Sequence, residues 1–134
     1  MITREADYAI RVMMLLARRQ GEGERGFSCL EIASEMDIPY RFLRKLVKRM
    51  VSAELLCSRR GKGGGLTLGP DAANLSLFDV LRVMSPAGTR LSQCLGEGEG
   101  CRRAGTCRMR RAIHRIQTSV DQQLSAVTIA SLAK

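Results

Sequence analysis

Residues 28–68 read SCLEIASEMDIPYRFLRKLVKRMVSAELLCSRRGKGGGLTL and contain two helix signals followed by a hairpin signal. Ser28 with Glu31 three positions later is a capping-box pair, which predicts a short helix over residues 28–36. After a short turn, residues 40–52 predict a second helix with one apolar and one basic face. The apolar face consists of Phe42, Leu43, Leu46, Val47 and Met50. Two helices joined by a short turn, the second of them basic, are the sequence form of a helix-turn-helix.

A glycine-rich turn between two short apolar segments follows the basic helix. Residues 55–58 and 66–68 predict two strands, and the sequence RRGKGGG at residues 59–65 predicts the turn that joins them. A basic hairpin placed directly after a helix-turn-helix is typical of the wing of a winged helix. The expected fold is therefore mainly α, a winged helix-turn-helix with a small β-hairpin wing.

Two further helices are predicted on either side of this unit. Residues 6–18 place apolar side chains three and four positions apart, which is the period of an amphipathic helix. Ser76 with Asp79 begins another helix that runs to Met84, after which the sequence SPAG ends it. Residues 1–85 are therefore expected to form the winged helix-turn-helix domain.

A long helix with a narrow apolar stripe is predicted near the C-terminus. It covers residues 107–126, and Thr128 begins one last short turn over residues 129–133. The stripe consists of Ile113, Ile116, Val120, Leu124 and Val127. So narrow a stripe is typical of a coiled-coil seam, whose expected partner is the same helix of a second chain. Residues 107–134 are therefore expected to form the interface of a homodimer. The alternative is that the helix packs against the winged-helix domain of its own chain.

Length and composition limit the classes of protein. The chain has 134 residues, of which 45% are apolar and 4% aromatic, enough for one compact unit with an aliphatic core. No apolar run reaches the roughly 20 residues of a membrane span, and Arg4, Glu5 and Asp7 stand where a signal peptide is apolar. A cytoplasmic protein without a membrane partner is expected. An enzyme is not expected, because no nucleophile, base and orienting group occur at suitable spacing.

Basic residues are concentrated on the two elements that a winged helix places on DNA. The net charge is +9, and residues 41–62 hold eight basic residues against Glu54 alone. Arg and Lys on a helix in the major groove reach guanine edges and phosphates, and glycine lets a wing approach the DNA backbone closely. The predicted contacts to double-stranded DNA are Tyr40, Arg41, Arg44, Lys45, Lys48, Arg49, Arg59, Arg60, Lys62, Gly63 and Gly64. Arg41, Arg44 and Lys45 are the base-reading candidates; the alternative is a charged face that only contacts water.

Five cysteines in a chain without an export signal indicate metal or redox chemistry, because thiols stay reduced in the cytosol. Cys29 and Cys57 have apolar neighbours and are expected in the core. The other three, Cys94, Cys101 and Cys107, have the spacing C-x6-C-x5-C. Cys94 and Cys101 lie in a glycine-rich loop over residues 86–106, and Cys107 follows this loop directly. Such a loop can wrap an iron-sulfur cluster. A zinc site is less favoured, because structural zinc sites usually combine two pairs of ligands that are close in the sequence, and these cysteines form no such pair. The other alternative is that the three thiols bind no metal.

This order of elements resembles the IscR/NsrR-type (Rrf-two) family of iron-sulfur transcription regulators. The resemblance rests on Asp7-Tyr8-Ala9, the wing RGKGGG at residues 60–65, Cys94, Cys101, Cys107-Arg108-Met109 and Thr128-Ile129-Ala130. It implies a homodimer that binds a palindromic operator through two winged helices. It also implies a 2Fe-2S or 4Fe-4S cluster, held by the three loop cysteines, that tunes the affinity for DNA.

The fourth cluster ligand is implied by the resemblance as well. The IscR branch has a histidine three residues after the last cysteine, where this chain has Arg110. In the NsrR branch an aspartate in the first helix of the other subunit completes the site, and Asp7 matches that position, with Glu5 and His114 as the reserves. The alternative is that Asp7 pairs with a neighbouring arginine or serves the start of its helix.

Together these features predict a DNA-binding transcription regulator, and a repressor because the chain has no evident segment for contacting RNA polymerase. Its signal would be iron-sulfur, redox or nitric oxide status, sensed through a cluster on the loop cysteines. One alternative is a cluster-free winged-helix regulator that depends on thiol chemistry or on a partner. Another, from a different class, is a small iron-sulfur carrier or electron-transfer protein, which leaves the basic helix and wing unexplained.

Overall fold

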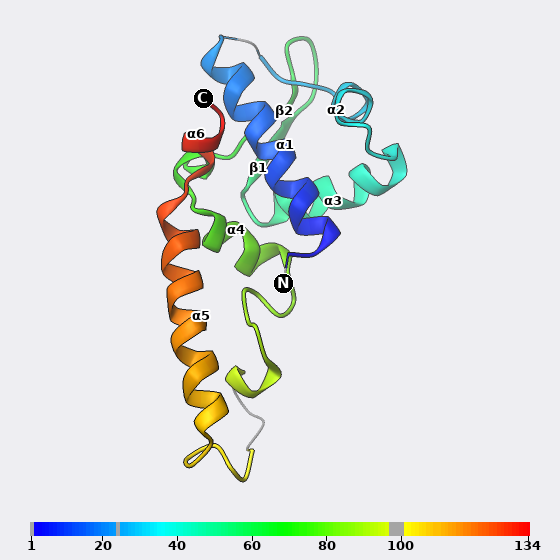
Figure 1. The fold of residues 1–134 in the computed structure, drawn as a ribbon. Helices are drawn as coiled ribbons and strands as arrows, with labels where there is room; N and C mark the ends of the chain where they lie inside the picture. Colours follow the sequence, from blue (N-terminus) through cyan, green and yellow to red (C-terminus); the bar gives the residue numbers. More distant parts are fainter. Residues whose placement is uncertain (1, 24, 97–100) are drawn as a thin grey trace.

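Helix α1 (Arg4–Gly21) is the central element of the computed structural model, which describes residues 2–23, 25–96 and 101–134 (Figure 1). The helix is longer than the predicted 6–18 because Thr3 caps it: the Ala6 N–H donates to Thr3 Oγ1 at 3.2 Å. Its inward face consists of Ala6, Ala9, Val12, Met13, Leu15 and Leu16, all of which are buried. The other helices and the hairpin pack around this face.

The predicted helix-turn-helix is present, with α2 at Cys29–Met36 and α3 at Tyr40–Ser52. Ser28 and Glu31 form the predicted capping box, in which the Ser28 N–H donates to Glu31 Oε2 at 2.7 Å. Asp37 closes α2 in the left-handed conformation and turns the chain into α3. The predicted apolar face of α3 is confirmed: Leu43, Leu46 and Met50 are buried, and Phe42 and Val47 pack partly buried against the core.

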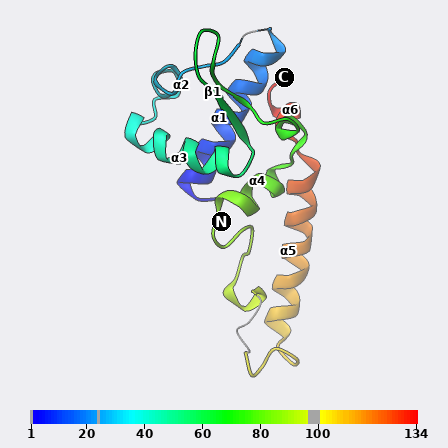
Figure 2. The same ribbon diagram turned by 180° about the vertical axis from the view of Figure 1, so that it is seen from behind.

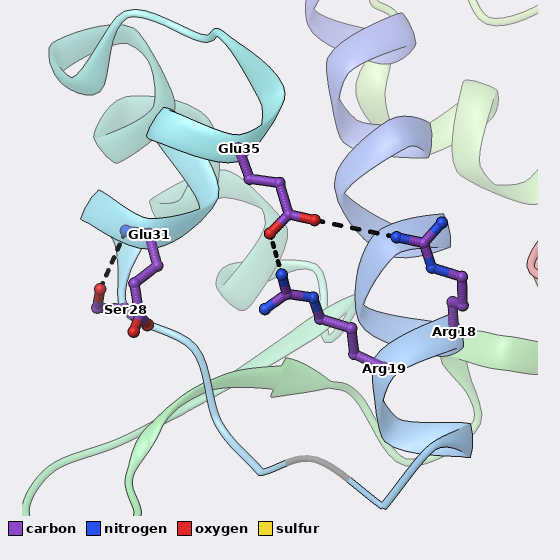
Figure 3. A network of polar contacts seen from close by, with 5 residues as sticks. All are labelled: Arg18, Arg19, Ser28, Glu31 and Glu35. Carbon is purple, nitrogen blue, oxygen red and sulfur yellow. Dashed lines mark hydrogen bonds and ion pairs between the residues drawn. The ribbon is translucent and has the colours of Figure 1, made fainter.

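Polar contacts hold α2 against the end of α1. The Glu35 carboxylate of α2 lies between the guanidinium groups of Arg18 and Arg19 on α1, as Figure 3 shows. Arg19 also lies over the Phe27 ring, with the guanidinium carbon 4.8 Å from the ring centroid. Ion pairs this exposed stabilise a fold by only about 0–1 kcal/mol, so their main effect is to orient the helix-turn-helix on α1.

The wing is an antiparallel hairpin of β1 (Leu56–Arg59) and β2 (Gly65–Leu68), within one residue of the predicted strands. Phe27 adds a third short segment that the sequence did not predict. Its N–H donates to the Leu66 carbonyl at 3.0 Å, and the Leu66 N–H donates back at 2.7 Å. The hairpin is thus tied by backbone hydrogen bonds to the segment that leads into α2.

Three helices form the rest of the fold: α4 (Leu77–Met84), α5 (Arg108–Ala126) and the short α6 (Ile129–Leu132). Two 3-10 turns, η1 (Ala72–Asn74) and η2 (Gln93–Leu95), lie between them. The predicted cap of α4 is confirmed, and hydrogen bonds from Ser76 lower the pKa of the Asp79 carboxyl. Cys107 and Thr128 cap α5 and α6.

The C-terminal end of α5 is joined to the winged helix by backbone hydrogen bonds. The Leu77 N–H donates to the Val127 carbonyl at 2.9 Å, and Ile129 beyond it is fully buried. The N-terminal end of α5 projects away from α1 and the wing, as the view from behind shows (Figure 2). The apolar stripe is accordingly divided: Leu124 packs against the core, whereas Ile116 is 55% exposed.

Cys29 and Cys57 are less buried than predicted. Both are half-buried, because Cys29 opens α2 at the surface and Cys57 alternates along β1 with the buried Leu56. Burial raises the pKa of the Cys29 thiol, and the charge of Arg44 opposes this shift. Within the described ranges, no helix combines the length and apolarity that crossing a bilayer requires.

Candidate DNA-binding surface and cysteine loop

The exposed face of α3 is basic along its whole length. All five predicted basic residues of this helix are exposed: Arg41, Arg44, Lys45, Lys48 and Arg49. Arg44 lies over the ring of Tyr40, which is 43% exposed, with the guanidinium carbon 5.9 Å from the ring centroid. Among the described residues, no carboxylate forms an ion pair with Arg41, Arg44, Lys45 or Lys48. These four side chains are therefore available to an external anion such as a DNA phosphate.

Arg49 has partners within the chain. Its guanidinium pairs with the Glu5 carboxylate of α1 and donates to the Met84 carbonyl of α4 at 3.3 Å. The side chain thus joins the recognition helix to the start of α1 and the end of α4. A contact between Arg49 and DNA would have to compete with these bonds, so we expect it to position α3 more than to bind phosphate.

The wing continues the basic surface from the end of α3. The Leu55 N–H donates to the Met50 carbonyl at 2.9 Å, so the hairpin begins without a linker. Its predicted contact residues Arg59, Arg60, Lys62 and Gly63 are exposed, and Gly64 is half-buried. Gly63 has a φ of +75°, and a Cβ on Gly64 would lie 2.5 Å from the Arg59 carbonyl oxygen. These two glycines are therefore required by the turn itself, whether or not DNA is bound.

Two of the three loop cysteines lie close to Arg110. The Arg110 backbone N–H donates to Cys107 Sγ at 3.3 Å, and its Nε donates to the Cys94 carbonyl at 3.1 Å. Cys94 Sγ is 3.1 Å from Ser92 Oγ, and Cys101 is exposed. Residues 97–100 of the predicted loop lie outside the described residues. Arg110, at the position of the IscR histidine, thus links the loop to the first turn of α5.

The loop cysteines fit an iron-sulfur cluster in their chemistry more than in their arrangement. Cysteine sulfurs are the usual ligands of such clusters, and two of these cysteines lie on the loop while Cys107 follows it directly. However, the part of the chain that the structure describes contains no group of three or more His, Cys, Asp or Glu side chains placed to hold a metal ion. Binding a cluster would therefore require the loop to bring its thiols together.

The candidates for a fourth ligand form no metal-binding group with the loop cysteines among the described residues. Asp7 Oδ2 accepts from Arg11 Nε at 2.9 Å, which matches the alternative prediction of a pair with a neighbouring arginine. Glu5 is paired with Arg49, and His114 is exposed on α5. Within one chain, both carboxylates are therefore used by arginines.

A buried glutamine fixes the first part of the loop to α5. Gln117 is 8% exposed, its Oε1 accepts from the Leu91 N–H at 2.7 Å, and its Nε2 donates to the Thr89 carbonyl at 3.0 Å. Asp121 accepts from Gln117 Nε2 at 2.8 Å and from the Thr89 hydroxyl at 2.7 Å. This clasp, formed by Gln117 and Asp121 with Thr89 and Leu91, was not predicted, because the sequence does not show that a single polar residue near an apolar stripe will be buried.

Replacing Gln117 by leucine is expected to lower the free energy of unfolding by about 2 kcal/mol, because two backbone groups lose their hydrogen-bond partner. Chemical denaturation at fixed protein concentration measures the change, and hydrogen exchange is expected to be faster at the Leu91 amide. Gln122→Leu is the matched control, since Gln122 is exposed on the same helix. Equal losses in the two variants would show that the clasp contributes nothing.

Comparison with known proteins agrees with this architecture. The model of the Rrf2 family, described as "Iron-dependent Transcriptional regulator", matches residues 2–134. The chain is 29% identical over 131 residues to the transcriptional repressor NsrR of Streptomyces coelicolor, covering 98% of this chain and 86% of NsrR. It is 27% identical over 131 residues to the regulator IscR of Sodalis glossinidius, covering 98% of this chain and 77% of IscR. The solved structure of CymR, "the Global Cysteine Regulator of B. subtilis", superimposes with a TM-score of 0.76 at 27% identity, covering 99% of this chain and 95% of CymR.

Proposed function

Because this chain belongs to the Rrf2 family and is therefore a DNA-binding transcription regulator, not an enzyme, we propose that it represses transcription as a homodimer on a palindromic operator. The observation that supports this most directly is the basic surface that runs from α3 into the wing. In the proposed complex Arg41, Arg44 and Lys45 contact bases in the major groove. Lys48 contacts phosphate, and Arg59, Arg60 and Lys62 of the wing follow the minor groove.

The proposed homodimer uses the part of α5 that its own domain leaves uncovered. Met109 is 66% exposed and Ile116 is 55% exposed, and both lie on the half of α5 that projects away from α1. Burying such side chains against a second copy contributes roughly 1.5–3 kcal/mol each. In this arrangement residues 1–85 bind DNA, residues 86–106 are the sensor loop and residues 107–134 form the dimer. The site of action is the cytoplasm, where the DNA is.

The proposed sensor is an iron-sulfur cluster of the 2Fe-2S or 4Fe-4S type, held by Cys94, Cys101 and Cys107. Asp7 of the partner subunit is the proposed fourth ligand, with Glu5 and His114 as reserves. Bound iron and sulfide would supply reactivity toward oxidants and nitric oxide. The arginines beside Cys101 and Cys107 in the sequence would help to stabilise the negative charge of a site made of sulfur ligands. A difference of about 1–3 kcal/mol in operator affinity between the loaded and unloaded dimers is sufficient for regulation.

A cluster-free regulator is the second candidate, and two observations favour it. Arg110 stands where the IscR branch has a ligand, and Asp7 and Glu5 are both paired with arginines of the same chain. In this case the loop thiols or a partner protein would receive the signal. Both candidates use the same basic surface and the same proposed dimer. They differ only in whether the loop cysteines bind a cluster.

An anaerobic visible absorption spectrum with iron and sulfide assays distinguishes the two candidates. We expect charge-transfer bands in the wild type and in Cys29→Ala/Cys57→Ala, and their complete loss in Cys94→Ala/Cys101→Ala/Cys107→Ala. A colourless wild-type protein that binds no iron on reconstitution would exclude the cluster and support the cluster-free regulator. Operator binding that does not weaken with salt would contradict the proposed role of the basic surface in both candidates, because release of counterions makes DNA binding steeply salt-dependent.

A further inference from the structure

Arg19, in the last turn of α1, contacts two segments that belong to different parts of the DNA-binding unit. Its guanidinium pairs with the Glu35 carboxylate of α2, and Figure 3 shows these two side chains pointing toward each other. The same guanidinium lies over the ring of Phe27, with its carbon 4.8 Å from the ring centroid. Phe27 in turn pairs with Leu66 of the wing. One side chain of α1 is thus linked to the helix-turn-helix and, through Phe27, to the wing.

The next residue of α1 reaches the wing directly. Gln20 Oε1 accepts from the Leu68 N–H of β2 at 3.1 Å. Phe27 pairs with Leu66 as an isolated bridge, and in an antiparallel ladder the next N–H on the same edge lies two residues along, at Leu68. The Gln20 side chain therefore accepts the hydrogen bond that a longer third strand would accept. The end of α1 completes the edge of β2 that the short Phe27 segment leaves unfinished.

These contacts attach the wing to the helix-turn-helix at a second place. At its base the hairpin follows α3 directly, since the Leu55 N–H donates to the Met50 carbonyl. On its other strand it is tied through the end of α1 to α2, and α2 packs against α3. The wing, α1, α2 and α3 therefore form a closed ring of contacts. If the ring opened at Arg19, the hairpin could change its angle to α3 about its base.

The angle between the wing and α3 matters because both elements are proposed to contact one DNA duplex. Elements that are held in the bound arrangement beforehand lose less conformational freedom on binding. A partly exposed ion pair and one cation–π contact contribute little to the stability of the fold, so Arg19 is not needed to keep the chain folded. We propose that Arg19 is a positioning residue for DNA binding, which holds the wing where it contacts the duplex bound by α3. This inference rests on the proposed function, because it requires the wing to bind DNA.

A double-mutant cycle on the full chain measures this coupling. The probe is a labelled palindromic duplex that the wild-type protein selects from a random library. In the wild-type background, Arg59→Ala/Arg60→Ala in the wing is expected to weaken binding about tenfold or more, because two charge-assisted contacts are lost. In the Arg19→Gln background the same wing substitutions should weaken binding less than about threefold, because a displaced wing no longer makes those contacts. Arg19→Gln alone should lose no more affinity than the wing variant, since it acts only through the wing.

Three further variants serve as controls. Arg18→Gln removes the neighbouring arginine, whose Nη2 lies 3.9 Å from Glu35 Oε1, and it should leave the affinity within about twofold. Arg19→Lys keeps a cation beside Glu35 and the Phe27 ring, so it should restore most of the affinity that Arg19→Gln loses. Gln20→Ala changes an exposed side chain and leaves the Arg19 contacts in place, and it should again reduce the effect of the wing substitutions. Circular dichroism confirms that each variant is folded.

The cycle separates this proposal from its rivals. Losses that multiply, so that the wing substitutions weaken binding equally in both backgrounds, would overturn the positioning role and assign Arg19 to a phosphate contact of its own. Equal losses in Arg18→Gln and Arg19→Gln would also overturn it, because charge alone would explain them. A wing variant that binds the duplex as tightly as the wild type would instead overturn the proposed wing contact, and this inference with it. The failure of the proposed function is thus seen in the wing variant alone, before Arg19 is changed.

Discussion

Replacing Arg41 and Arg44 by alanine is expected to weaken operator binding about 100-fold or more, because each well-placed contact between arginine and guanine contributes about 1–3 kcal/mol. Both side chains are exposed on α3, and neither belongs to the apolar face that holds the helix in place. The loss should therefore appear in DNA binding without a loss of stability. Fluorescence anisotropy with labelled operator at several salt concentrations measures the effect.

Controls for this prediction come from the same helix and from α5. Lys48→Ala should weaken binding to all DNA sequences similarly and reduce the salt dependence, as expected for a phosphate contact. Arg111→Gln/Arg115→Gln removes the same charge from a surface remote from α3, and it should leave the operator affinity within about twofold. If that variant lost as much affinity as the α3 variant, net charge and not the α3 surface would control binding.

Replacing Gly65 by alanine is expected to lower the free energy of unfolding by about 3 kcal/mol and to weaken operator binding through loss of the wing. Gly65 has a φ of +124°, which side chains other than glycine rarely adopt, and a Cβ there would lie 2.8 Å from the Phe27 backbone nitrogen. Gly65→Ala therefore introduces backbone strain and also a clash with the Phe27 backbone, which is relieved when the Phe27 segment and β2 move apart. Chemical denaturation measures the first effect, and operator titration measures the second.

Substitutions at two other glycines separate the effect of backbone strain on stability from the effect of the clash. Gly61 has a φ of +97° with nothing within 4 Å of an added Cβ, so Gly61→Ala should cost only the strain, about 1 kcal/mol. Gly21 lies within α1 and also has open space, so Gly21→Ala is expected to be neutral or to stabilise by up to about 1 kcal/mol. A Gly65→Ala variant as stable as Gly21→Ala would show that the contact with Phe27 is not needed.

Several of the predicted site residues also have partners or roles within the chain, and their binding roles stay predictions. Arg49 and Asp7 were both expected to bind something outside their own chain, and each has an internal partner, in Glu5 and Arg11. Gly63 and Gly64 were expected to let DNA approach, whereas their geometry is already required by the hairpin turn. Arg110 was identified only as a replaced ligand, yet it joins Cys94 to the first turn of α5.

The amino-acid sequence by itself determined the elements whose causes are local. The capping boxes at Ser28 and Ser76, the bounds of α3 and its division into an apolar and a basic face were all predicted and are confirmed. Each of these features depends on residues within four positions of one another, so the sequence pattern is sufficient to predict it. The winged-helix order and the family follow from these local elements in sequence.

Only the tertiary structure decided which distant residues meet. Phe27 pairs with Leu66, Arg49 pairs with Glu5, and the buried Gln117 accepts a hydrogen bond from the Leu91 N–H, although nothing in the neighbouring sequence selects these partners. Such contacts depend on how the helices pack around α1, and periodicity reports which face of a helix is apolar but not what covers that face.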